Sequence, residues 1–266
     1  MSLYVSEISV YPVKSLAAVR PERARLIRTG FEHDRQWMIV DEDGWFITQR
    51  QFPWMARIGT GVSGAGLRLS VPGHPPMDVP ITRDGPVREV RVWESVCEAV
   101  DQGDCAAQVL SDYLGRTCRL VRMRDGFERV PGDSYRAVSP QSSVGFADSS
   151  ALMLLGEASL ADLNARLEVP VSMDRFRPNL VVAGGTPFCE DGWNRIRVGE
   201  VTLRLVKDCI RCEIPTIDQK TGEKGVEPME TLESYRAGPL GTRFGRKVVH
   251  ESAGVLSVGD TVTVLA

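Results

Sequence analysis

Over the first hundred residues, apolar and polar positions alternate in short runs. The runs LRLSVPG (67–73), MDVPI (77–81) and REVRVWESV (88–96) are separated by glycine and proline. A period of two predicts strands with one buried face. The segment RQWMIVDEDGWFITQRQ (35–51) predicts two strands joined by a turn at Asp43 and Gly44. So many short strands indicate a small β-barrel or sandwich.

A helical period replaces this alternation near residue 104. Val109, Leu110, Tyr113 and Leu114 recur at helical spacing, and Gly115 is a suitable residue to end the helix. We expect this helix, within 101–120, to link an N-terminal β-barrel domain (1–100) to a second domain (121–266). The polar, glycine- and proline-containing segment 122–143 predicts a long loop, a kind of segment that is often functional.

The second half mixes two helices with further strands. Asp148 is expected to cap a first helical turn, and Ser159 a second helix that directs leucines 160, 163 and 167 into a core. Alternation returns in NLVVAGG (179–185), RIRVGEVTLRLVKDCIRC (195–212), RKVVHES (246–252) and VLSVGDTVTVL (255–265). We therefore predict a mostly β fold with some α (α+β), in which a second, largely antiparallel barrel follows the first.

The composition of the chain excludes some classes of function. The chain has 266 residues, 42% hydrophobic and 25% charged, with a formal net charge of −3 and a pI of about 5.8. These values are ordinary for a globular protein and give no global attraction to nucleic acid or to an anionic membrane. The N-terminus does not resemble a signal peptide, and no apolar run approaches membrane-spanning length. We expect a cytoplasmic protein without a nucleic-acid or membrane partner.

The segment KDCIRCEIPTID (207–218) holds the pair Cys209 and Cys212. A structural zinc site needs about four ligands, and the chain has one such pair and three histidines, so zinc is disfavoured. A thioredoxin-type couple is disfavoured because the pair follows an antiparallel-looking strand. Positions three apart on a strand face opposite sides, so only one cysteine should reach a site unless the chain bends. Nearby Arg211 and Lys207 favour a thiolate, either a nucleophile or a soft-metal ligand.

Several motifs in sequence order resemble the MOSC family, which is named after the C-terminal domain of molybdenum cofactor sulfurase. They are CIRCEIPTIDQKTG (209–222), EPMETLESYR (227–236) and the closing VLSVGDTVTVL. The segments ISVYPVKSL (8–16) and HDRQWMIVDEDGWFITQRQFPWM (33–55) are similar to the β-barrel domain that precedes MOSC in the amidoxime-reducing branch. FADSSALMLLGEASLADLNARL (146–167) and DRFRPNLVV (174–182) also match that branch. The resemblance covers nearly the whole chain.

The resemblance implies a molybdenum–molybdopterin cofactor held between the two domains, with Cys212 as the protein ligand of the metal and the catalytic cysteine. The other positions that it implies for cofactor binding are Lys14, Ser15, Arg35, Arg50, Gln51, Ser149, Ser150, Arg177 and Asn179. Lysine, arginine and hydroxyl groups suit the anionic phosphate end of such a cofactor. Ser149 and Ser150 stand at the expected helix start, where free N–H groups also favour an anion.

The family likeness further implies reduction of N-hydroxylated compounds such as amidoximes, hydroxamic acids and hydroxylated nucleobases. Electrons are expected from a separate ferredoxin- or flavin-type donor protein, because the chain shows neither the iron–sulfur domain nor the membrane anchor of some relatives. Two alternatives stay open at this point. The protein could carry sulfur as a persulfide on Cys212, supplied by a partner desulfurase, or it could carry the molybdenum cofactor to other enzymes.

Overall fold

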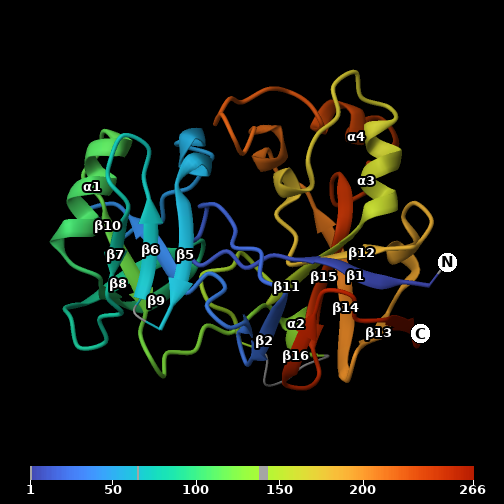
Figure 1. The fold of residues 1–266 in the computed structure, drawn as a ribbon, viewed down its shortest axis with the longest axis horizontal. Coiled ribbons are helices and arrows are strands. Elements are labelled where there is room, and N and C mark those ends of the chain that lie inside the picture. Colours follow the sequence, from blue (N-terminus) through green and yellow to red (C-terminus); the bar gives the residue numbers. More distant parts are fainter. Residues whose placement is uncertain (1, 65, 138–142) are drawn as a thin grey trace.

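The computed structural model describes residues 2–64, 66–137 and 143–266. The chain forms two β-rich halves that lie side by side, and both termini lie on the half built mainly from the C-terminal sequence (Figure 1). The predicted mostly β fold with some helix is confirmed. In the described parts of the chain, no helix is both long and apolar enough to cross a membrane.

The first half contains two antiparallel sheets. One has the strand order β4 (Trp37–Val40), β10 (Arg119–Met123), β9 (Ser95–Asp101) and β8 (Val87–Val92). The other has the order β5 (Gly59–Ser63), β6 (Gly66–Ser70) and β7 (Met77–Val79). The predicted turn after β4 is confirmed, since the N–H of Gly44 donates to the carbonyl of Asp41 at 3.1 Å and Gly44 has a φ of +79°. Glycine tolerates that left-handed conformation without strain.

The predicted helix is α1 (Asp104–Leu114), and Gly115 ends it in a left-handed conformation. Its apolar face, with Ala106, Leu110 and Leu114, belongs to the core cluster that also contains Trp37 and residues of β6. The strand after it, β10, pairs with β4 and β9 of the first half. The domain limits at residues 100 and 120 stay a prediction.

The second half is organised by a seven-stranded sheet. Its order is β1 (Tyr4–Ile8), β12 (Leu180–Ala183), β11 (Leu152–Gly156), β15 (Arg243–His250), β14 (Val201–Ile210), β13 (Arg195–Val198) and β17 (Val262–Val264). Only the β11–β12 pair is parallel among the described strand pairs of this sheet. A smaller sheet has the order β16 (Gly254–Ser257), β2 (Arg23–Ile27) and β3 (Gly30–Phe31). The alternating segment 195–212 contains the hairpin β13–β14.

The topology makes the N-terminal segment cross between the halves. β1 pairs with β12, and β2 pairs with β16, so the chain begins in the sheets of the second half. The segment between β1 and β2 nevertheless reaches β4, where the N–H of Lys14 donates to the carbonyl of Trp37 at 2.8 Å. The N–H of Arg35 donates to the carbonyl of Tyr11 at 2.7 Å. This crossing segment, with its hydrogen bonds to the chain around β4, places Lys14 and Arg35 where the two halves meet.

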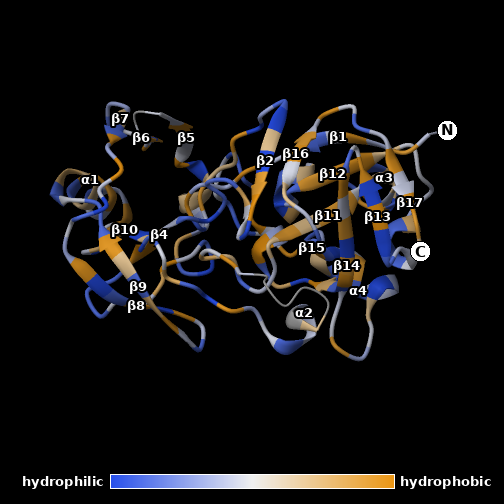
Figure 2. Ribbon diagram, turned by 90° about the horizontal axis from the view of Figure 1, so that it is seen from below, coloured by the Kyte–Doolittle hydropathy of each residue, from blue (hydrophilic) through white to orange (hydrophobic). Residues whose placement is uncertain are grey.

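The remaining helices are short and cover the second half: α2 (Asp133–Arg136), α3 (Glu157–Asn164) and α4 (Met229–Arg236). Single 3₁₀ turns are η1 (Pro53–Arg57), η2 (Met173–Phe176), η3 (Cys189–Gly192) and η4 (Ile214–Thr216). Leu163 is buried and Leu160 and Leu167 pack on the same cluster, as predicted. In Figure 2 the apolar colour concentrates on strands such as β10 and β11, which supply core residues in the two halves.

Two local predictions around these elements are wrong. No helical turn begins at Asp148, because the segment after it enters the buried strand β11. Ser159 does not cap α3; it lies inside the helix, buried, and its hydroxyl donates to Glu190 Oε1 at 2.7 Å. Short polar sequences resemble helix caps. After Asp148, however, the chain pairs as strand β11 with β12 and β15, so no helix forms there.

Candidate functional site

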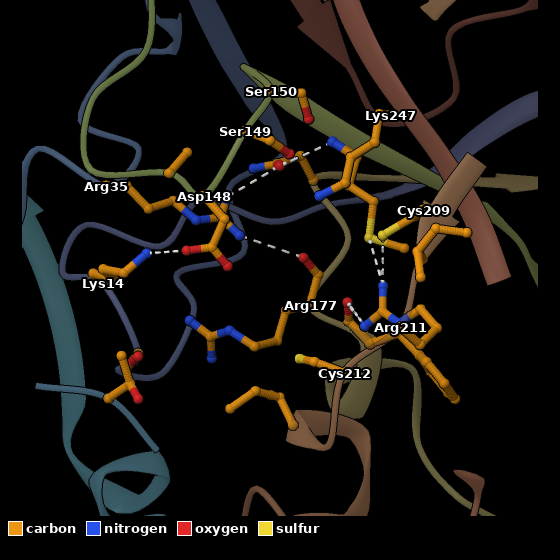
Figure 3. A pocket seen from close by; sticks show the side chains of 18 of the residues that line it. Lys14, Arg35, Asp148, Ser149, Ser150, Arg177, Cys209, Arg211, Cys212 and Lys247 are labelled. Carbon is orange, nitrogen blue, oxygen red and sulfur yellow. Dashed lines mark hydrogen bonds and ion pairs between the residues drawn. The ribbon is translucent and has the colours of Figure 1, made fainter. Parts of the chain in front are cut away.

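A cavity of about 140 Å³ lies where the two halves meet. Its walls come from the segments 14–15, 35, 48–50, 147–153, 176–179, 209–214 and 247. Figure 3 shows Lys14 and Arg35 on one side of this space and Cys209 and Lys247 on the other. Of the candidates predicted from the sequence, the cavity brings together Lys14, Ser15, Arg35, Arg50, Ser149, Ser150, Arg177, Asn179 and Cys212.

Positive charge dominates the cavity wall. The described lining residues include the bases Lys14, Arg35, Arg50, Arg177, Arg211 and Lys247, against the single acid Asp148. Arginine and lysine donors that converge on one space favour an anionic ligand. The wall therefore suits an anion, although the chain as a whole carries a net charge of −3.

Asp148, predicted only as a cap, is the carboxylate partner of Lys14. Lys14 Nζ donates to Asp148 Oδ1 and to the carbonyl of Phe146 at 2.9 Å. Trp93 Nε1 donates to the same Asp148 oxygen at 3.0 Å. Burial lowers the pKa of Lys14, and the ion pair opposes that shift. Desolvation would raise the pKa of Asp148, but Lys14, Trp93 and Lys247 outweigh it and hold this pKa well below its usual range.

Arg35 is fixed by a buried network. Its guanidinium donates to Asp34 Oδ2 at 2.6 Å and to Asn179 Oδ1 at 3.0 Å. The Asn179 amide in turn donates to the carbonyl of Ser9 at 3.0 Å and to Asp34 Oδ1 at 3.1 Å. Asn179 thus lines the cavity, but its side chain is already bonded within the protein and orients Arg35.

Arg177 points into the same region and shares the aromatic support of Arg35. Arg35 and Arg177 have φ values of 48° and 54°, and each guanidinium carbon lies 4.2 Å from the centroid of the Tyr11 ring. Left-handed backbone at residues other than glycine is strained and tends to occur at functional sites. The one hydrogen-bond acceptor near the Arg177 guanidinium among the described residues is Gln219 Oε1 at 3.5 Å. Burial lowers the pKa of Arg177 to about 10.

The two cysteines occupy different environments in the same cavity. Cys212 is exposed, and Arg50 donates to its sulfur at 3.3 Å while stacking on Trp93 with 5.0 Å between the guanidinium carbon and the ring centroid. Cys209 is buried, and Arg211 donates to its sulfur at 3.0 Å. Both cysteines line the cavity.

Both cysteines reach the site because the chain bends between them, which is the exception that the sequence prediction allowed. Strand β14 ends at Ile210, and the N–H of Arg211 bonds the carbonyl of Thr242 at 2.7 Å as the chain turns into η4. The alternation of a strand no longer applies beyond that point. Burial would raise the pKa of Cys209, but Arg211 and Lys247 outweigh it, so this pKa is lowered.

The predicted serines line the cavity without a helix start. The hydroxyl of Ser149 accepts a hydrogen bond from Tyr135 at 3.4 Å, and that of Ser150 donates to the carbonyl of Leu152 at 2.9 Å. The helix-terminus explanation for these serines is wrong, because the segment leads into a strand.

Gln51 lies outside the wall. It is exposed, and its Oε1 accepts from the N–H and the hydroxyl of Thr48, both at 2.8 Å. Its buried neighbour Gln49 lines the cavity instead and donates to the carbonyl of Ser15 at 2.7 Å. Alternation along the chain gave no sign of which glutamine would face inward, because this segment forms no regular strand.

Arg129 supports the loop that carries Asp148, and sequence reasoning missed it. Its buried guanidinium donates to the carbonyls of Gly145 at 3.2 Å, of Ala147, and of Asp148 at 3.3 Å. In the sequence it is one arginine of a polar segment, with no pattern that distinguishes it. Its three carbonyl contacts fix the backbone that presents Asp148 and the serines.

Replacing Arg129 by methionine should lower the free energy of unfolding by about 3 kcal/mol, because buried carbonyls then lose a charged donor. Chemical denaturation with urea measures this change. The matched control is Arg28→Met, which removes an exposed ion pair with Glu128 and should cost under about 1 kcal/mol. Equal effects for both variants would contradict the role given to Arg129.

The side chains available to ligate a metal limit which metals and cofactors the cavity can hold. In residues 2–64, 66–137 and 143–266, no three His, Cys, Asp or Glu side chains gather to hold a metal ion. A metal at this site would therefore need ligands from a bound group besides those of the chain, from which the exposed sulfur of Cys212 and the buried sulfur of Cys209 line the cavity. The cationic wall and the exposed thiol fit an anionic cofactor that carries its own metal ligands.

Comparison with known proteins identifies both halves. The MOSC N-terminal β-barrel domain matches residues 2–117, and the MOSC domain matches residues 141–263. The chain is 34% identical to mitochondrial amidoxime-reducing component 1 of Homo sapiens, over 98% of this chain and 82% of the relative. It is 34% identical to mitochondrial amidoxime reducing component 2 of Bos taurus, over 97% and 82%. Molybdenum cofactor sulfurase of Danio rerio is 31% identical over 98% of this chain, which spans 34% of that protein.

Proposed function

Because this chain belongs to the family that joins an MOSC N-terminal β-barrel domain to an MOSC domain, we propose that it is a molybdenum-cofactor-dependent reductase of N-hydroxylated compounds. The observation that carries the proposal is the exposed sulfur of Cys212, which has a guanidinium 3.3 Å away and lies in a cavity lined by six basic residues. The amidoxime-reducing relatives, matched over nearly all of this chain, supply the reaction class.

Each end of the cavity has a role in this proposal. Cys212 is the protein ligand of the metal, since a thiolate is a soft ligand suited to such centres. The anionic end of the cofactor is bound by Lys14, Ser15, Arg35, Ser149, Ser150 and Arg177. Asn179 acts through Arg35, whose guanidinium it orients.

When bound, the molybdenum centre supplies the two-electron removal of oxygen from an N–OH group. With two protons and two electrons, the N–OH compound becomes the N–H compound and water. Electrons come from a separate donor protein. The protein contributes ligation, orientation and a basic wall.

Individual side chains prepare the site before substrate arrives. Arg50 holds its guanidinium beside the Cys212 sulfur and is itself stacked on Trp93. Tyr11 supports Arg35 and Arg177 at equal distance and is anchored by its hydroxyl, which donates to the carbonyl of Pro178 at 3.1 Å. Aromatic support of this kind fixes arginine donors at a lower entropic cost than mobile side chains would carry.

The decisive experiment uses protein produced in cells that make the molybdenum cofactor. We expect about one molybdenum and one pterin per chain, and benzamidoxime reduction to benzamidine with reduced methyl viologen as electron donor. Protein without molybdenum, or loaded protein that leaves benzamidoxime unchanged, would exclude the proposed reductase.

The same material distinguishes the sulfur-carrier alternative, which the sulfurase relative supports. That alternative predicts a Cys212 adduct with the mass of one added sulfur atom and no molybdenum by elemental analysis. A chain that binds the cofactor tightly and hands it to another enzyme, without reducing any N-hydroxylated compound, would instead be a cofactor carrier.

Anion binding should weaken at alkaline pH, because Arg177, with a pKa of about 10, loses its charge as the pH rises through that value. The measurement is isothermal titration of cofactor-free protein with inorganic phosphate between pH 8 and 11. The Arg177→Met variant should lose this decrease in phosphate affinity. It should keep only the decrease due to Lys14, whose pKa is also lowered by burial. A phosphate affinity in the native chain that stays constant over this range would contradict a charged, ligand-binding Arg177.

A further inference from the structure

A second cavity of about 770 Å³ adjoins the first. The two share six lining residues: Arg50, Asp148, Ser149, Ile210, Cys212 and Lys247. The first cavity holds the residues assigned to the cofactor, and Cys212 stands on the boundary between them. A substrate that reaches the metal next to Cys212 can therefore occupy the second cavity while the cofactor occupies the first.

The wall of the second cavity depends on two irregularities in β14. The register of β14 against β15 shifts between Leu205 and Lys207 and again between Asp208 and Ile210. In a regular strand the neighbours Lys207 and Asp208 would face opposite sides, yet both line this cavity, as does Ile210. Bulges of this kind re-aim side chains and are common beside active sites.

Lys207 brings a cation to this wall. Its ammonium lies 4.4 Å from the Tyr135 ring centroid and donates to the hydroxyl of Ser134 at 3.3 Å. In the described parts of the chain, no carboxylate lies within ion-pair distance of Lys207, whereas Asp208 is shared by Arg243 at 3.5 Å and Arg246 at 3.6 Å. Arg246 is further occupied by the carbonyls of Glu190, Asp191 and Leu205.

Arg243 reinforces the positive charge at the rim. It lines the cavity, its side chain is 45% exposed, and its one ion-pair partner among the described residues is shared. Apart from these residues and the boundary residues Arg50, Asp148, Ser149, Cys212 and Lys247, the wall is apolar or glycine and includes Tyr135, Ile210 and Leu240. An aromatic and aliphatic surface beside Lys207 and Arg243 matches a planar ligand that carries an anionic group.

We propose that this second cavity is the substrate site and that Lys207, with Arg243, selects N-hydroxylated substrates that bear a carboxylate or phosphate group on a planar ring. The inference rests on the proposed function and names the substrate class. Lys207 and Cys212 both line this cavity. A para-substituted benzene ring can therefore direct its N–OH end toward Cys212 and its anion toward Lys207.

The test compares benzamidoxime with 4-carboxybenzamidoxime and 4-phosphonobenzamidoxime on cofactor-loaded protein. We expect kcat/KM to be about tenfold higher for the anionic substrates, as for one added charge-assisted contact. Lys207→Glu should abolish or reverse this preference. Arg197→Glu makes the same charge change at an exposed position of β13 outside both cavities, and should preserve the preference.

The carboxylate and phosphonate arms show which anion the site prefers. Equal kcat/KM for neutral and anionic substrates, or an unchanged preference in Lys207→Glu, would overturn the inference. Loaded protein that reduces none of the three compounds would instead count against the proposed function.

A second readout does not depend on catalysis. Binding of 4-carboxybenzamidoxime to cofactor-free protein should weaken about tenfold in Lys207→Glu and change little in Arg177→Met. The opposite pattern would place the anion in the first cavity and refute the second cavity as its site. The binding result therefore decides the inference even if the reduction assay fails.

Discussion

Replacing Cys212 by serine should remove bound molybdenum and lower benzamidoxime turnover by more than about 100-fold. A serine hydroxyl is a harder ligand than a thiolate and stays protonated near neutral pH, so it cannot replace the sulfur as a soft metal ligand. The volume change is small and the position is exposed, so the fold should persist. Metal analysis and steady-state kinetics on the same preparation measure both effects.

Two cysteine variants serve as controls for that result. Cys105→Ser alters the other exposed cysteine, which lies on α1, and should keep full metal content. Cys209→Ser alters the buried thiol beside Arg211 in the same cavity. Metal retained in Cys212→Ser but lost in Cys209→Ser would transfer the ligand assignment to the buried sulfur.

Replacing Arg35 by alanine should destabilise the protein by about 3–5 kcal/mol, in addition to weakening cofactor binding. Asp34 has a side chain only 2% exposed and would lose the guanidinium that bonds it at 2.6 Å. Asn179 Oδ1 would lose a donor at the same time. An uncompensated buried carboxylate is among the most costly single defects in a folded protein. The midpoint of urea unfolding measures the loss.

Arg177→Ala is the matched control, because Arg177 stacks on the same Tyr11 ring but is ion-paired with no carboxylate in the described parts of the chain. We expect little loss of stability in the cofactor-free protein, since burial already disfavours the charged form of Arg177. Both variants should bind less cofactor. If Arg35→Ala unfolds at the same urea concentration as Arg177→Ala, the buried network around Asp34 does not have the energetic weight assigned to it.

Features that depend only on residues close in the sequence could be predicted from the sequence. The Asp-Gly turn after β4, the end of α1 at Gly115 and the β13–β14 hairpin all follow from local conformational preference and alternation. Where two local patterns competed, the prediction failed: the polar stretch around Asp148 resembles a helix start, yet the residues after it pair into a sheet. Tertiary pairing outweighs a cap preference worth about 1 kcal/mol.

The residues of the candidate site divide in the same way into those that local sequence identifies and those that it does not. Motifs that resemble a known family named nine of the residues that line the cavity, because those residues form short, ordered signatures in the sequence. Arg129 and Lys207 carry no such signature. Arg129 acquires its role through carbonyls 16 to 19 residues away, and Lys207 through register shifts that break the alternation of β14.

By itself, the sequence determined the short strands, the helix after residue 100 and the excess of β structure. Only the tertiary structure decided that β1 and β2 join the second half, which brings Lys14 and Arg35 to residues more than one hundred positions away. It also decided that both cysteines share one cavity. The physical reason is that periodicity records which face of a segment is buried, whereas the partner that buries it depends on sheet order and register.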